Sequence, residues 1–363
     1  MDTQLPVAEY GSQLRCGLPI LVCYYQTCDM SKSKHSVDFP VDLVYTWVDG
    51  NDPAWREKRN MYMPERPTTG SVPNHISDAR WRENNELVYS LRSVERYAPW
   101  VNRIYIVTDG QCPAWLNTEH PKICIVDHSE ILPADALPVF SSHAIESCIY
   151  RIPGLSEHFV YGNDDTFFGA PTTRDDFFRA DGRPIVRVKG ARFKRDKARN
   201  GGNYYRVLYR MQSLVEERWG RLICHEPHHN FDAYRKSDFE KCIASLPDEW
   251  AATSRSRFRR NEDMQRCYVS YYAVAAEGAK LRKVNRYNRI TNPISLVRAL
   301  ITGRYAADSR WIKLHLKDYN RDFEKYNPLM FCMNDNASTS DADCRRMVEF
   351  LASKFPYKST FEL

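Results

Sequence analysis

The sequence predicts an α/β protein built on a largely parallel β-sheet. Short apolar runs alternate with segments of helical periodicity between residues 42 and 165, a pattern typical of βαβ units. Several of the apolar runs end in aspartates, and such sheets bind ligands outside the carboxyl ends of their strands. The 363-residue chain is 43% hydrophobic, enough for a sizeable core. It has no apolar run near the roughly 18 residues that a membrane-spanning helix needs.

Four apolar runs rich in β-branched and aromatic residues are predicted to be the strands. They cover 42–48, 103–108, 122–127 and 158–161. Apolar residues recur at helical spacing between 87 and 98, directly before Pro99, and this predicts a helix that ends at the proline. A second helix is predicted around 142–151.

The predicted strands deliver acidic side chains to one edge of the sheet. These are Asp49, Asp52, Asp109, Asp127, Asp164 and Asp165. The set favours a site for a metal ion and phosphate, because carboxylate oxygens are the ligands that hard cations prefer. Asp-Gly turns are also common, so Asp109 taken alone is explained as well by a turn.

The sharpest local pattern is Asn163-Asp164-Asp165, directly after an apolar run. Paired carboxylates at the end of a strand can hold Mg²⁺, which then binds diphosphate oxygens. The alternative is an Asx turn with no ligand.

Beyond residue 180 the alternation fades and the chain becomes more helical. Helices are predicted over 205–219, 236–245 and 262–279, the last beginning with acids that favour the helix dipole. The basic stretch 189–203 is predicted to be a mobile surface loop. A solvated face is its default interpretation, and contact with an acidic substrate or a membrane surface is the alternative. Residues 64–80, rich in proline and polar groups, are predicted to be a loop.

Histidines are concentrated in a predicted polar loop over 225–230. The spacing fits neither the HExxH helix nor a cysteine–histidine zinc site. A single histidine acting as general base fits better, since its ordinary pKa lies near neutrality. A surface cluster without a role is the alternative.

Arginines crowd into 255–260, just before the predicted helix start at Asn261. Guanidinium groups suit bidentate contact with phosphate oxygens. Nucleic-acid binding is the rival interpretation, but one short basic cluster and a net charge of +6 give it little support.

The termini and cysteines indicate the compartment. Eleven scattered cysteines favour a reducing cytosol. Residues 17–25 imitate the core of a signal peptide, but they are short, interrupted by proline and without a basic start or a small-residue cleavage site. We therefore expect residues 1–40 to be a peripheral segment.

Four regions in this order resemble the Stealth family of sugar-phosphate transferases. The first is DLVYTWVDGNDP, over 42–53; the second runs from 85 to 165 and includes YSLRS and IVTDGQ. The third runs from HEPH at 225–228 to EDMQ at 262–265, and the fourth is CMNDN at 332–336. Alone, the fourth is also explained as a turn. The resemblance covers about residues 42–340. The family offers no role for residues 1–40, which lie outside this range, or for the basic stretch 189–203, which lies within it.

The family includes bacterial capsular and exopolysaccharide phosphotransferases and the animal GlcNAc-1-phosphotransferase. The resemblance implies a Rossmann-like core, similar to that of GT-A transferases, over 41–180. A helical part over 181–345 would complete the site, and 346–363 would be a tail. The implied activity is transfer of a hexose-1-phosphate, such as GlcNAc-1-phosphate, from a UDP-sugar to a sugar hydroxyl. UMP would leave, and the product would be a capsular or exopolysaccharide.

The resemblance also implies roles for individual residues. Mg²⁺ (or Mn²⁺) would be held by Asp165, Asn334 and Asp335. Catalysis would use Arg259 for the developing charge, His225 as base, Asp165, and Glu146 as donor-sugar ligand or competing base. The nucleotide pocket would be formed by Trp47, Asp49, Asp52 and Arg92. We expect Asp165, His225, Arg259 and Asp335 to line one cleft.

The partners expected are a nucleotide-sugar donor and a glycan acceptor, without nucleic acid. The expected location is cytoplasmic, with peripheral contact to membrane-bound capsule machinery as an open alternative. The nearest rival function is a metal-dependent GT-A-type glycosyltransferase that releases the nucleoside diphosphate. A non-catalytic saccharide-binding protein is a further rival. The donor sugar, the acceptor, the linkage, the choice between polymerisation and single transfer, and the oligomeric state stay open.

Overall fold

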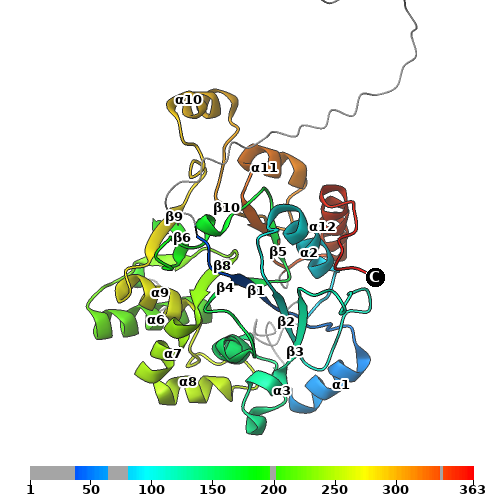
Figure 1. The fold of residues 1–363 in the computed structure, drawn as a ribbon, viewed down its shortest axis with the longest axis vertical. Helices are drawn as coiled ribbons and strands as arrows, with labels where there is room; N and C mark the ends of the chain where they lie inside the picture. Colours follow the sequence, from blue (N-terminus) through cyan, green and yellow to red (C-terminus); the bar gives the residue numbers. More distant parts are fainter. Residues whose placement is uncertain (1–36, 64–80, 197–201, 336–337) are drawn as a thin grey trace, which may run out of the picture. The chain divides into compact units, whose positions relative to one another are not determined.

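The computed structural model describes residues 37–63, 81–196, 202–335 and 338–363. All of these belong to one compact unit, Ser36–Leu363 (Figure 1). The predictions made for residues 1–36, for the loop at 64–80 and for the middle of the basic stretch lie outside the described residues. No described helix combines the length and apolarity that crossing a bilayer requires.

The central feature is a five-stranded sheet with the order β3-β2-β1-β4-β8. Its strands are β1 (Val41–Thr46), β2 (Ile104–Thr108), β3 (Ile123–Asp127), β4 (His158–Asn163) and β8 (Asp232–Arg235). The first four are parallel to one another, and β8 pairs antiparallel with β4. The prediction of an α/β protein with a mainly parallel sheet is confirmed.

Both faces of this sheet are buried. Successive residues of β1 alternate between two apolar clusters: Val44 joins one, and Leu43 and Tyr45 join the other. Strands covered on both faces have few polar positions, which is why they appear in the sequence as continuous apolar runs.

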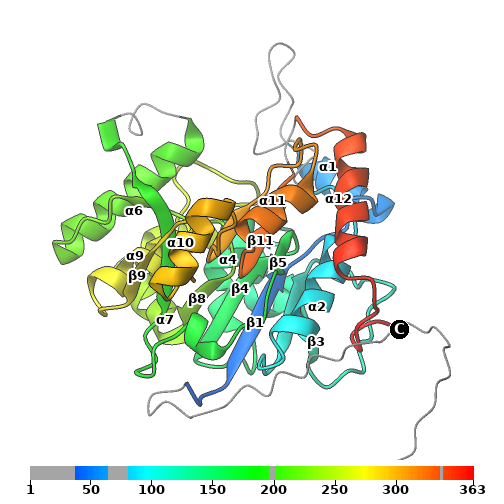
Figure 2. The same cartoon turned by 90° about the horizontal axis from the view of Figure 1, so that it is seen from above.

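Helices cover the two faces. One cluster includes residues of α4 (Ser142–Cys148), α6 (Asn203–Trp219), α7 (Lys236–Ser245), α8 (Pro247–Ser254) and α9 (Cys267–Ala275). The other is built partly from α2 (Glu86–Tyr97), whose Leu87, Leu91 and Val94 face the sheet at the predicted spacing. Beside α2 lies α12 (Asp341–Lys354), as Figure 2 shows.

Two small sheets and several short helices complete the unit. One sheet has the order β10-β11-β5 and the other β7-β6-β9. Their strands are β5 (Thr166–Phe168), β6 (Ile185–Arg192), β7 (His225–Pro227), β9 (Lys280–Val284), β10 (Ser309–Trp311) and β11 (Met330–Cys332). The remaining α-helices are α1 (Pro53–Tyr62), α3 (His128–Ile131), α10 (Pro293–Thr302) and α11 (Tyr319–Tyr326).

The helix predicted over 262–279 begins later than expected, at Cys267. The side chain of Asp263 accepts hydrogen bonds from the hydroxyl of Ser256 at 2.5 Å and from the backbone N–H of Arg260 at 2.7 Å. These bonds hold a turn in front of the helix. The acids therefore do not occupy its first turn, and the arginine cluster does not adjoin its N-terminus.

The predicted loop at 189–203 and the predicted polar loop at 225–230 are partly strands. Lys189 to Arg192 belong to β6, which pairs with β9 through Ile185 to Lys189. His225 to Pro227 form β7, with His225 opposite Arg192. The apolar residues Ile185, Val186 and Val188 of β6 are buried. Their burial and the backbone pairing make this part of the chain a strand, although its sequence is largely polar.

The predicted boundary at residue 345 falls inside α12. The chain after this helix also packs against the core, since Phe361 is buried and Glu362 forms an ion pair of 2.7 Å with Arg92 of α2.

Candidate functional site

Two adjoining clefts lie at the carboxyl ends of the central strands. The larger has a volume of about 1100 Å³ and the smaller about 280 Å³. The smaller is bounded by the residues at and just after the ends of β1 and β4. Both clefts are lined by Ser142, Glu146, Asn163, Arg259 and Asn334, which therefore form a shared wall.

Asp165 lies at the centre of the acidic side of the smaller cleft. It follows β4 and is buried. Asn334 donates from Nδ2 to Oδ2 of Asp165 at 2.8 Å, and the backbone N–H of Met333 donates to the carbonyl of Asp165 at 3.0 Å. The pairing of β5 with β11, with Thr166 opposite Cys332, explains how residues so distant in sequence meet.

The carboxyl groups around Asp165 repel one another. Burial, and then the charges of Glu86 and Asp165, raise the pKa of Asp164 well above its ordinary value. Burial and Glu83 raise the pKa of Glu86 to about 8. Burial raises the pKa of Glu83 to about 7, against the effect of its hydrogen bond from Trp47. Such crowding is the electrostatic setting in which a cation binds favourably.

Asp165 itself behaves differently. Burial opposes its ionisation, but contacts with His229 and Asn334 outweigh burial and lower the pKa of Asp165. Nε2 of His229 lies 3.9 Å from Oδ1 of Asp165. Asp165 is therefore the carboxylate of this group that is best maintained in its charged form.

The donor set fits a hard divalent cation. Asp165, Asn334 and Asp335 line the smaller cleft together with Asp164, and an Asn334 amide turned by 180° would present its oxygen. Donor atoms of Asp165, His229 and Cys332 also lie within 4.8 Å of one another. A thiol is a soft ligand, whereas the carboxylate and amide oxygens are the donors that a hard cation prefers.

Basic groups face the acids across the shared wall. The guanidinium of Arg266 lies 3.4 Å from Glu146, contacts the carboxylate of Asp232, and lies 4.8 Å above the ring of Tyr161. This ion pair orients the carboxylate of Glu146 at the shared wall.

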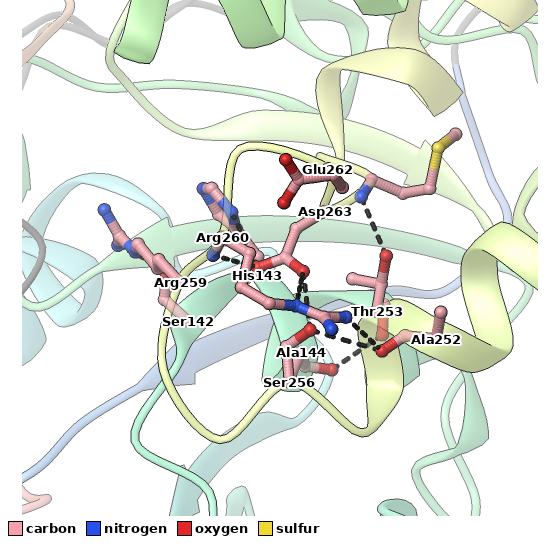
Figure 3. A network of polar contacts seen from close by, with 12 residues as sticks. Ser142, His143, Ala144, Ala252, Thr253, Ser256, Arg259, Arg260, Glu262 and Asp263 are labelled. Atoms are coloured by element: carbon pink, nitrogen blue, oxygen red, sulfur yellow. Dashed lines mark hydrogen bonds and ion pairs between the residues drawn. The ribbon is translucent and has the colours of Figure 1, made fainter. Parts of the chain in front are cut away.

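Arg259 reaches the cleft from a loop that other side chains hold in place. Its Nη2 donates to the hydroxyl of Ser142. Figure 3 shows the network behind it, centred on Asp263. This fully buried carboxylate accepts from Ser256 and from the backbone of Arg260, and lies 3.7 Å from Nδ1 of His143. Asp263 thus positions the loop without itself lining either cleft.

The three histidines of 225–229 differ in their surroundings. Nδ1 of His225 lies 3.0 Å from the carbonyls of Lys189 and Ala191. Carbonyls only accept, so Nδ1 carries the proton and Nε2 is left as the acceptor. His225 is buried, with 7% of the residue exposed, and it lines neither cleft. His228 and His229 do line the larger cleft, and burial lowers the pKa of His228 to about 4.

Six of the predicted site residues come together around the smaller cleft. They are Trp47, Glu146, Asp165, Arg259, Asn334 and Asp335. His225 is outside it, so three of the four residues expected in one cleft share it. The indole Nε1 of Trp47 donates to Glu83 at 2.8 Å.

Three residues expected in the nucleotide pocket have other contacts. Asp52 accepts from the backbone of Ala54 and caps α1. The side chain of Asp49 accepts from the backbone of Asn51. Arg92 binds both carboxylate oxygens of Glu362, at 2.9 and 2.7 Å. None of the three lines either cleft.

Sequence reasoning missed several functional candidates. Arg266 directly follows EDMQ, and His229 adjoins HEPH, so both lie beside patterns already singled out. Glu86 and Arg82 line the acidic cleft, and Arg82 lies 3.3 Å from Asp335. Glu86 lies inside the second family region, which begins at residue 85, but no site role is assigned to it, and Arg82 lies outside all four regions.

The fold defines an α/β protein with two clefts at the carboxyl ends of its parallel strands, the edge at which such sheets bind their ligands. More specifically, the chain belongs to the Stealth family. Conserved region 1 of that family matches residues 39–66, and conserved region 2 matches residues 80–186. The two matches confirm the family resemblance and cover the first two of the four sequence regions.

Relatives with assigned names support the same family. The capsular polysaccharide phosphotransferase WcwK of Streptococcus pneumoniae is 33% identical over 89% of this chain and 99% of its own length. An exopolysaccharide phosphotransferase of Streptomyces coelicolor is 37% identical over 90% of this chain. The match spans 53% of that protein and 57% of a second Streptomyces coelicolor relative, so the chain spans about half the length of these relatives.

Among solved structures, the galactosyltransferase LgtC in complex with donor and acceptor sugar analogues aligns with 86% of this chain and 96% of its own. The TM-score is 0.42 and the identity 10%. The assignment of fold class rests on the strand order and the parallel pairing described above.

Proposed function

We propose that this protein transfers a hexose-1-phosphate, such as GlcNAc-1-phosphate, from a UDP-sugar to a sugar hydroxyl in capsular or exopolysaccharide synthesis. The observation that carries the proposal is the smaller cleft, where Asp165, Arg259 and Asp335 meet from three separate stretches of the chain. The names of the relatives support the same class of reaction.

In the proposed reaction, the acceptor hydroxyl oxygen attacks the phosphorus that carries the sugar. A new P–O bond forms, the bond from that phosphorus to the bridging oxygen breaks, and UMP leaves with the electron pair. The hydroxyl proton passes to a base. Such transfer depends chiefly on positioning and on neutralising the charge of the phosphoryl oxygens.

Arg259 is proposed to neutralise this charge. It lies on the shared wall and therefore lines both the larger and the smaller cleft. The hydrogen bonds of Asp263 hold its loop in a fixed position. A preorganised guanidinium needs no rearrangement as charge develops.

Asp165, with Asp335 and Asn334, is proposed to hold Mg²⁺ or Mn²⁺. When bound, such an ion supplies positive charge to diphosphate oxygens. The crowding of Glu83, Glu86 and Asp164 around the same cleft supports this assignment, because an added cation relieves their repulsion.

His225 is the first candidate base, because its contacts with two carbonyls leave Nε2 as a proton acceptor; its burial outside both clefts counts against it. His229 is the second candidate, supported by its place on the larger cleft. The carboxylate of Glu146 is engaged in an ion pair with Arg266. We assign it to contact with donor-sugar hydroxyls at the shared wall.

The released nucleotide tests the proposal. The full chain would be incubated with UDP-sugars, a divalent cation and a capsular oligosaccharide, and the products separated by anion-exchange chromatography. UMP together with a phosphodiester product supports the proposal. UDP release would support the alternative, a glycosyltransferase that attacks the anomeric carbon. Glycan binding without turnover of any donor would indicate a saccharide-binding protein.

A further inference from the structure

Helix α10 lies away from the central sheet, at the end of an excursion that leaves β9 and returns to β10 (Figure 1). Its ends are well defined. The Asn292 side chain accepts from the backbone of Ser295 at 2.8 Å, Pro293 occupies the first turn, and Gly303 ends the helix in the left-handed conformation. The helix is therefore a locally completed element.

The apolar residues of α10 point away from the protein. Ile294 is 82% exposed, Ile301 79%, Leu300 61% and Val297 54%. The one buried residue of the helix is Ala299, and small or polar Ser295 and Thr302 line a hollow of about 330 Å³ beneath it. An ordinary surface helix turns its apolar stripe toward the core, so α10 has the reverse orientation.

The segment that carries the helix is strongly basic. Between residues 278 and 307 there is no Asp or Glu. The segment contains Lys280, Arg282, Lys283, Arg286, Arg289, Arg298 and Arg304. Of these, Arg298 and Arg304 are exposed on and just after the helix. Two members are engaged within the protein: Arg282 with Asp308 at 2.9 Å and Arg289 with the carbonyl of Asn327 at 2.7 Å.

We propose that α10 lies in the surface of an anionic phospholipid bilayer, with its apolar face among the acyl chains. An exposed apolar face bordered by arginines is the usual arrangement of an interfacial helix, and anionic headgroups attract a basic segment of this kind. A second copy of the chain fits less well. A two-fold interface brings the same surface of each copy together, and here it would oppose two basic segments.

The excursion also begins and ends at the larger cleft. Val284, Asn285 and Arg286 lie before the helix and Ala307 and Ser309 after it, and all line that cleft. Binding of α10 to a bilayer would therefore hold one wall of the larger cleft near the lipid headgroups.

Vesicle sedimentation with the full chain tests the proposal. One set of vesicles contains phosphatidylcholine with phosphatidylglycerol, and the other contains phosphatidylcholine alone. We expect the protein to sediment with the anionic vesicles and to be released by salt. The double variant Leu300→Ser/Ile301→Ser should bind about tenfold more weakly or worse, because two apolar side chains no longer enter the bilayer. The variant Arg298→Gln/Arg304→Gln should lose most of the preference for anionic lipid.

Met61→Ser and Tyr357→Ser are matched controls, since both side chains are largely exposed and lie outside α10. They should bind as the unchanged protein does. Circular dichroism and the thermal midpoint check that each variant folds. The proposal is overturned if the protein ignores both kinds of vesicle, or if the α10 variants bind as well as the controls. It is also overturned if the protein is a dimer that Leu300→Ser/Ile301→Ser converts to a monomer.

Discussion

Nδ2 of Asn334 lies 2.8 Å from Oδ2 of Asp165, although the two residues are 169 positions apart in the chain. The antiparallel pairing of β5 with β11 brings them together, because Asp165 directly precedes one strand and Asn334 closely follows the other. The acidic end of the central sheet is thus completed by residues near the end of the chain. Substitutions at either position should act on the same cleft.

Replacing Asp165 by Asn should abolish transfer. The variant keeps the side-chain volume but removes the charge that is best maintained in the acidic cleft, so affinity for a divalent cation should fall as well. Isothermal titration with Mg²⁺ or Mn²⁺ and assay of UMP release would measure the two effects. Asp181→Asn, at an exposed turn, is the control. Full activity in Asp165→Asn, or in the unchanged protein after chelation by EDTA, would contradict the metal assignment.

Arg259→Ala should fold normally and lose turnover by about 10²–10³-fold, or about 2.7–4 kcal/mol of transition-state stabilisation. The reason is that this guanidinium is expected to act on charge that develops only during transfer. Steady-state kinetics, with the thermal midpoint as a check on folding, would measure the loss. Arg255→Ala removes an arginine from the same cluster whose partner is the exposed Asp135, and it should keep its activity. Equal kinetics for the two variants would remove Arg259 from the mechanism.

His225→Gln and His229→Gln should separate the two candidate bases. If His225 is the base, its variant should lose transfer while still binding the donor, and His229→Gln should retain turnover. Donor binding measured by calorimetry and UMP release measured over a range of pH would distinguish the outcomes. The reverse pattern would assign the base to His229, which lies beside Asp165.

Asp263 should make stability depend on pH. Burial opposes its ionisation, but His143, Arg260 and Ser256 together lower the pKa of its carboxyl group. Its charged form therefore stabilises the fold above the unfolded pKa of about 3.9. This contribution should disappear as the pH falls from that value through the lower pKa of the folded state.

Urea unfolding of the unchanged protein and of Asp263→Asn, between about pH 3 and pH 7, would measure what the charge of Asp263 contributes to the free energy of unfolding. The variant should be less stable near neutrality, and the difference should shrink as the pH falls. The turnover of Asp263→Asn should also fall, because the loop that positions Arg259 is no longer held in place. A difference in stability that does not change with pH would show that the charge of Asp263 is not the cause.

The central sheet could be predicted because its strands are buried on both faces. Their residues alternate between two apolar clusters, so β1, β2 and β4 each contain at least three consecutive apolar or aromatic residues, and the runs stand out in the sequence. Strands of the small sheets could not be found in this way. β7 and β11 are three residues long, and only their distant partners determine that they are strands.

The candidate site shows the same limit. Asp165 could be found from its place after an apolar run, and Trp47 and Glu146 from the family pattern. Arg92, Asp49 and Asp52 belong to the same pattern, but the structure engages them in an ion pair with Glu362 and in turns and caps around α1. Glu86 lines the smaller cleft because α2 packs beside the ends of the central strands. No pattern in a single sequence shows that Glu86 lies close to Asp164 and Asp165.

The shared wall borders both the larger and the smaller cleft, and this has a practical consequence. The wall consists of Ser142, Glu146, Asn163, Arg259 and Asn334. A single inhibitor that carries a nucleotide-like group for one cleft and a sugar-like group for the other could occupy both clefts at once. Its two halves would be tethered, so the second half would bind at a high effective concentration after the first. The joint compound should therefore exceed either fragment in affinity by far more than their individual strengths suggest.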